Sequence, residues 1–132
     1  IVRKMCLIVD RSSPMSRARS VVALKQQLAE GWSIFIYPEG SRNRTDAALG
    51  PFFDGAFRIA IQTAAPLAVQ TLVNVREITG KDGSGLQPGI ARVIWEEPII
   101  TEGMTAADIP MLREKVEMMM KERLEAYSKS LV

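Results

Sequence analysis

The chain has 132 residues, the length of one ordinary domain, and its 47% hydrophobic and 24% charged residues are typical of a folded globular protein. Seventeen Lys and Arg against fifteen Asp and Glu leave a net charge of +2, too little for a strongly electrostatic nucleic-acid binder. The absence of histidine excludes a Ser-His-Asp triad, a histidine general base and a histidine metal site within these residues. The single cysteine, Cys6, excludes an internal disulfide and fits a reducing compartment.

The chain starts at Ile1 rather than at methionine, and an apolar run follows almost at once. We therefore expect a piece of a longer protein that lacks its N-terminal part; a processed mature chain is the alternative. The longest charge-free stretch, residues 59–75, contains Pro66 and is shorter than the ~20 apolar residues that a membrane span needs. We expect no transmembrane segment in these residues and expect the fragment to be soluble.

The first elements in chain order are a strand and a helix. Residues 5–9 are rich in strand formers and end at Asp10-Arg11. Hydroxyl side chains precede Pro14, which suits a first helical turn, and Gly31 is a typical residue to close a helix. This pattern predicts a helix over residues 14–30.

A second strand leads into a long polar loop. Residues 33–37 are the clearest candidate for a buried strand, which Pro38-Glu39-Gly40 ends. Residues 41–50 predict a polar loop, and residues 55–63 predict a short helix.

The second half of the chain predicts two strands and a long helix. Residues 66–75 and 90–95 predict strands, with a turn at residues 81–85 between them. Residues 109–127 predict a helix, because apolar side chains recur at helical spacing. The order of elements predicts one α/β domain over residues 1–132, with a mostly parallel central sheet flanked by helices.

The loop after residues 33–37 has the composition of an anion site. Ligands of α/β sheets collect at the carboxyl ends of strands. Gly40 allows the backbone N–H groups to turn toward a ligand, Ser41 adds a hydroxyl donor, and Arg42 and Arg44 supply guanidinium groups. Glu39 would brace one of these arginines. An ordinary solvated loop is the alternative on composition alone.

A second arginine follows the first predicted strand. If the two predicted strands are parallel neighbours, their carboxyl ends lie side by side, and Arg11 and Arg42 converge on one crevice. The alternative is that Asp10 accepts hydrogen bonds at the helix entry and that Arg11 is a surface charge.

Four blocks of the sequence resemble the 1-acyl-glycerol-3-phosphate acyltransferase family of glycerophospholipid acyltransferases. The first block resembles the family's Phe-Pro-Glu-Gly-Ser/Thr-Arg block and is the run Ile36-Tyr37-Pro38-Glu39-Gly40-Ser41-Arg42. The other three blocks are residues 8–11, an apolar strand ending in Asp-Arg; residues 52–57, similar to Phe-x-x-Gly-Ala-Phe; and residues 65–69, a looser match in which Val69 replaces a proline. Their order and spacing agree with the family over residues 7–73.

The resemblance implies an α/β acyltransferase whose catalytic His-x-x-x-x-Asp block lies upstream of these residues. In the family, the histidine is the general base for a glycerol hydroxyl that attacks an acyl thioester of coenzyme A or acyl carrier protein. The resemblance also implies that Arg11, Glu39, Gly40, Ser41 and Arg42 bind the acceptor's phosphate. It implies no bound cofactor, lysophospholipid and acyl thioester as partners, and a location at the cytoplasmic face of a membrane through missing N-terminal segments.

These implications lead to an expected function in phosphatidate and phospholipid synthesis. The full-length protein would transfer an acyl group to 1-acyl-glycerol 3-phosphate, and the histidine-free chain alone would be inactive. An acyltransferase acting on another lyso-lipid or on glycerol 3-phosphate is one alternative. A non-catalytic phosphate-binding module and a generic α/β domain with a chance loop are the others.

Overall fold

The computed structural model describes Cys6, residues 13–80 and residues 85–128. The chain divides into two compact units, Ile1–Ile36 and Tyr37–Val132, and each is described by itself. Outside the described residues lie the strand predicted over residues 5–9, apart from Cys6, the Asp10-Arg11 pair and most of the turn predicted over residues 81–85. That residues 1–132 form a single domain stays a prediction.

The first unit contains helix α2, Pro14–Ala29. Its start is built locally, because the Ser13 hydroxyl accepts a hydrogen bond from the Ser16 N–H at 3.2 Å and Pro14 occupies the first turn. Gly31 follows the helix with φ of +87°, a conformation that glycine adopts without steric cost. The predicted helix over residues 14–30 is confirmed.

The strand predicted over residues 33–37 is wrong. These residues belong to neither of the strands that the structure describes, and the side chains of Phe35 and Tyr37 are 58% and 64% exposed. An apolar run becomes a buried strand only where neighbouring strands and helices cover it, and that cover is a property of the tertiary structure.

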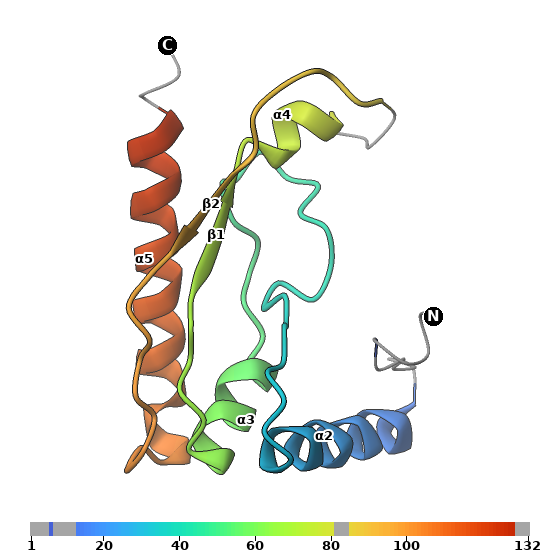
Figure 1. The fold of residues 1–132 in the computed structure, drawn as a ribbon, viewed down its shortest axis with the longest axis vertical. Coiled ribbons are helices and arrows are strands. Elements are labelled where there is room, and N and C mark those ends of the chain that lie inside the picture. The colour runs from blue at the N-terminus through green and yellow to red at the C-terminus, as the bar shows by residue number, and fades with distance from the viewer. Residues whose placement is uncertain (1–5, 7–12, 81–84, 129–132) are drawn as a thin grey trace. The chain divides into compact units, whose positions relative to one another are not determined.

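The second unit holds the remaining helices and strands, drawn in Figure 1. The predicted helices over residues 55–63 and 109–127 are confirmed, and each of the two predicted strands of this unit is present in a shorter form. Two short helices, α4 and η1, were not predicted. The elements are α3 Gly55–Thr63, β1 Gln70–Val73, α4 Val75–Thr79, β2 Arg92–Trp95, η1 Ala106–Asp108 and α5 Ile109–Ser128.

The two strands pair antiparallel, with Gln70 opposite Trp95 and Val73 opposite Arg92. A further antiparallel bridge joins Leu67 to Ile99. The expected mostly parallel sheet is therefore not found among the described residues. The described part of the link between β1 and β2 contains only the five-residue helix α4, whereas strands of a parallel pair are usually joined by a long crossover helix. Helices with a small sheet remain compatible with an α/β fold.

The core of the second unit lies where α5 packs against β1 and α3. Its buried side chains come from segments far apart in the sequence, and α5 covers the core on one side of the sheet. They are Phe52, Phe57, Val69, Ile99, Ile109, Leu112 and Val116.

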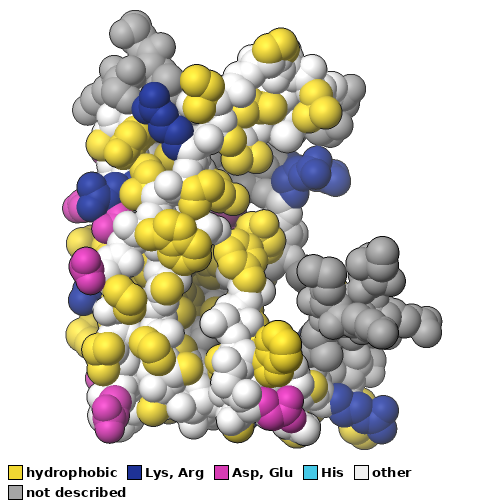
Figure 2. Space-filling view, in the orientation of Figure 1, with side chains coloured by type: hydrophobic (Ala, Val, Ile, Leu, Met, Phe, Trp, Pro, Cys, Tyr) yellow, Lys and Arg dark blue, Asp and Glu magenta, His cyan; other side chains and the backbone are white. Residues whose placement is uncertain are grey.

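Hydrophobic side chains are also common on the surface of the second unit, as the yellow atoms over α5 and the strands in Figure 2 show. Val93 and Trp95 alternate along β2 and are 51% and 59% exposed. Among the described residues, no helix combines the length and apolar character needed to cross a membrane.

Candidate functional site

The segment that carries the candidate site residues begins with a β-turn. The Gly40 N–H donates to the Tyr37 carbonyl at 3.0 Å, and Pro38 occupies a turn position that suits its fixed φ. Gly40 has φ of +65°, in the left-handed region that favours glycine. Because its N–H closes the turn, Gly40 does not present that group to a ligand in this structure.

The polar loop after this turn returns to its starting point. The Phe53 N–H donates to the Pro38 carbonyl at 2.9 Å, which ties the two ends of residues 39–52 together. Next to this tie, the rings of Phe52 and Phe57 are stacked in the core with centroids 6.4 Å apart. Phe52 and Phe57 therefore anchor the end of the loop to the core.

Glu39 closes the loop a second time. Its Oε2 accepts a hydrogen bond from the Gly50 N–H at 2.7 Å, although the two residues are 11 positions apart. This contact differs from the expected brace, because no ion pair joins Glu39 to an arginine among the residues that the structure describes.

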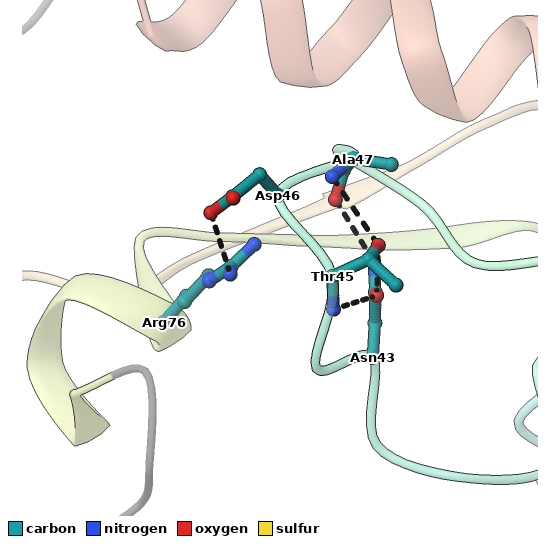
Figure 3. A network of polar contacts seen from close by, with 5 residues as sticks. All are labelled: Asn43, Thr45, Asp46, Ala47 and Arg76. Atoms are coloured by element: carbon teal, nitrogen blue, oxygen red, sulfur yellow. Dashed lines mark hydrogen bonds and ion pairs between the residues drawn. The ribbon is translucent and has the colours of Figure 1, made fainter.

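Asn43 organises the inside of the loop. Its Oδ1 accepts hydrogen bonds from the Thr45 N–H at 2.9 Å and the Thr45 hydroxyl at 2.7 Å, and its Nδ2 donates to the Ala47 carbonyl at 2.9 Å. Such side-chain bonds to nearby backbone are typical of Asx turns. Figure 3 shows Asn43 beneath this short turn.

An ion pair joins the loop to α4. Arg76 Nη2 lies 3.8 Å from Asp46 Oδ1, and Figure 3 shows the two side chains pointing toward each other. Because the Asp46 side chain is 89% exposed, this ion pair contributes little to stability. It does show that the loop lies beside α4.

The donors expected to bind phosphate lie on the outside of this tied loop. Ser41, Arg42 and Arg44 are exposed. Neither arginine takes part in an ion pair within the described residues, so both guanidinium groups are available to an anion. Arg11 lies outside the described residues, and its convergence with Arg42 stays a prediction.

Besides Asn43, the sequence analysis missed Gly50, Asp46 and Arg76, which also shape the loop. The dipeptide Gly50-Pro51 carries a local signal, because glycine before proline is typical of a loop boundary. Nothing local identifies Glu39 as the partner of Gly50 or Arg76 as the partner of Asp46, since both contacts join distant positions.

Comparisons with known proteins agree with the sequence blocks. A family model described as Acyltransferase matches residues 2–73, which include the whole loop and α3. The chain is 38% identical over 93 residues to the chloroplastic 1-acyl-sn-glycerol-3-phosphate acyltransferase BAT2 of Brassica napus, covering 69% of this chain and 26% of that protein. It is 30% identical over 89 residues to 1-acyl-sn-glycerol-3-phosphate acyltransferase alpha of Homo sapiens, covering 67% of this chain and 31% of that protein.

The chain thus spans about a quarter to a third of the length of these relatives. No solved structure matches it significantly. The family model covers more than half of the chain and includes the blocks at residues 36–42 and 52–57, so the chain belongs to the Acyltransferase family.

Proposed function

We propose that this chain forms the acceptor-phosphate-binding part of an enzyme that acylates 1-acyl-glycerol 3-phosphate. The observation that carries the proposal is the exposed Arg42, held on a loop whose two ends are tied together. The names of the relatives support this acceptor, because they specify 1-acyl-sn-glycerol-3-phosphate acyltransferases.

In the proposed reaction, the free hydroxyl of the acceptor attacks the carbonyl carbon of an acyl thioester carried by coenzyme A or acyl carrier protein. The new ester bond forms, the carbon–sulfur bond breaks, and the thiol leaves with the proton taken from the hydroxyl. An alcohol needs a general base for this step, and the 132 residues contain no histidine. We therefore assign the base to residues outside this chain.

The role of this chain is to hold the acceptor in place. A guanidinium group can bind a phosphate through two parallel charge-assisted hydrogen bonds, which fixes both distance and orientation. Arg42 would make that contact, with Ser41 and Arg44 as neighbouring donors. Because the proposed acceptor is a lipid, we also propose that the whole enzyme works at a membrane surface; the cytoplasmic face is what the family resemblance implies.

The test is Arg42→Ala in the full-length enzyme, with the concentration of each substrate varied in turn. Hydrogen bonds to charged groups contribute roughly 1.5–3 kcal/mol, so kcat/KM for the phosphorylated acceptor should fall roughly tenfold to hundredfold. KM for the thioester should stay nearly unchanged. Arg42→Lys should recover part of the loss, because an ammonium group keeps the charge but lacks the planar fork.

The control is Arg58→Ala, which removes an exposed arginine that lies in α3, outside the loop. It should leave both KM values within about twofold. If Arg42→Ala raises KM for the thioester alone, the loop binds the thioester and not the acceptor. An unchanged kcat/KM in Arg42→Ala would overturn the proposed phosphate contact. Replacing the acceptor by glycerol 3-phosphate or another lyso-lipid in the same assay distinguishes the alternative acceptors.

A further inference from the structure

We propose that Gly50 is a positioning residue, whose backbone N–H holds the Glu39 carboxylate and thereby fixes the loop that presents Ser41 and Arg42. This inference rests on the proposed function and adds to it a residue outside the sequence block that carries the resemblance. It also changes the role of Glu39, which would act through the backbone of its own loop.

The first observation is the hydrogen bond itself. At 2.7 Å between the Gly50 nitrogen and Glu39 Oε2, it has the length of a strong charge-assisted bond. Both residues are partly buried, so the bond is less exposed to competition from water than one on an open loop.

The second observation is the space around Gly50. A Cβ atom at this position would lie 2.7 Å from Glu39 Oε2 and 3.8 Å from the Asn43 side-chain carbon Cγ. The first distance is too short for two unbonded atoms, so a side chain would displace the carboxylate. Gly50 does not have a positive φ. A side chain at position 50 is therefore incompatible with the Glu39–Gly50 bond in this geometry, because of the close approach of Glu39 and not because of backbone strain.

The third observation is where the bond lies in the loop. Arg42 lies between the two bonded residues, and the loop is also tied at its base by the Phe53 N–H to Pro38 carbonyl bond. Without the Glu39–Gly50 bond, residues 40–49 would have more conformations to lose when a ligand binds. Loss of the bond should therefore weaken acceptor binding without changing the chemical step.

The experiment compares Gly50→Ala with Gly55→Ala in the full-length enzyme. Gly55 is the matched control, because it also lacks a positive φ and a Cβ there meets nothing within 4 Å. Gly50→Ala and Glu39→Ala should each raise KM for the acceptor by about tenfold, with smaller changes in kcat and in KM for the thioester. Gly55→Ala should leave all three values within about twofold.

The double variant Glu39→Ala/Gly50→Ala should be no worse than the more damaging single variant, because both changes remove the same hydrogen bond. Amide exchange at Gly50 should accelerate in Glu39→Ala and stay slow in Gly55→Ala. If Glu39→Ala raises the acceptor KM while Gly50→Ala does not, Glu39 acts directly on an arginine or the substrate, and the inference is overturned.

The Arg42→Ala variant separates this inference from the proposed function. If Arg42→Ala raises the acceptor KM and Gly50→Ala leaves it unchanged, the phosphate site stands and the positioning role fails. If Arg42→Ala, Gly50→Ala and Glu39→Ala all leave the acceptor KM unchanged, both proposals fail together.

Discussion

Two threonine side chains, each 1% exposed, have opposite hydrogen-bonding situations. The Thr101 hydroxyl lies within hydrogen-bond distance of the Ala60 carbonyl at 3.1 Å and the Ala65 carbonyl at 2.8 Å, at the end of α3. The Thr71 hydroxyl in β1 has no hydrogen-bond partner among the described residues. A buried polar group without a partner costs stability, whereas a bonded one offsets that cost.

We therefore expect the same substitution to change stability in different directions at the two sites. Thr101→Val should lower the free energy of unfolding by roughly 1–3 kcal/mol, because it leaves two carbonyl groups at the end of α3 without the hydroxyl. Thr71→Val should be neutral or stabilising, because it removes an unsatisfied hydroxyl and valine favours strands. Urea unfolding of the two variants measures both effects, and equal losses would contradict the assignment.

At the scale of elements, α5 is joined to the end of β2 by polar contacts at the surface. The Arg123 guanidinium donates two hydrogen bonds to the Glu96 carboxylate, one of them at 2.9 Å to Oε2. The Arg92 guanidinium lies 5.8 Å from the ring centre of Tyr127 on the same helix, in cation–π range. These contacts hold the strand pair against the long helix outside the apolar core.

The Glu96 contact makes stability depend on pH. Hydrogen bonding from Arg123 holds the pKa of the Glu96 carboxyl below its ordinary value, against a smaller opposing effect of desolvation. A lowered pKa in the folded state gives stability that is present above the unfolded-state pKa of about 4.3 and is lost as pH falls through the folded-state value.

We expect the stability advantage of the wild type over Glu96→Gln to be largest near neutral pH and to shrink between about pH 5 and pH 3. Urea unfolding across this range measures it. The control is Glu97→Gln, at an exposed neighbour with no ion pair among the described residues, whose difference from wild type should depend less on pH. An advantage over Glu96→Gln that does not change with pH would show that the contact contributes nothing in solution.

At the scale of the whole molecule, the proposed function separates binding of the acceptor's phosphate from acyl transfer. The loop with Arg42 lies within it, whereas it contains no histidine to take the proton from a hydroxyl. These 132 residues should therefore bind the acceptor without acylating it.

We expect the 132 residues alone to give no measurable thiol release from an acyl thioester in the presence of lysophosphatidate, whereas the full-length enzyme does. The same 132 residues should still bind glycerol 3-phosphate, more weakly after Arg42→Ala, as measured by titration calorimetry. Turnover at a rate comparable to that of the full-length enzyme would show that another group serves as the base.

The sequence by itself determined the longer helices α2, α3 and α5 and the family. The Ser13-Pro14 start, the glycine after α2 and the apolar spacing of residues 109–127 act within a few residues of each other, so local chemistry is enough to predict α2 and α5. The segments expected to form β1 and β2 were also found from their composition. The blocks at residues 36–42 and 52–57 likewise led to the Acyltransferase family, which the comparisons confirmed.

Only the tertiary structure decided which distant groups meet. Apolar composition could not determine that β1 and β2 pair antiparallel, or that Phe35 is exposed, because strand pairing and burial depend on what lies beside a segment. The same is true of the loop, where the partner of Glu39 is a backbone N–H that carries no signature in the sequence. Charge suggested an arginine as that partner, but chain geometry brought Gly50 to the carboxylate, because hydrogen bonds across a loop depend on how its two ends are held together.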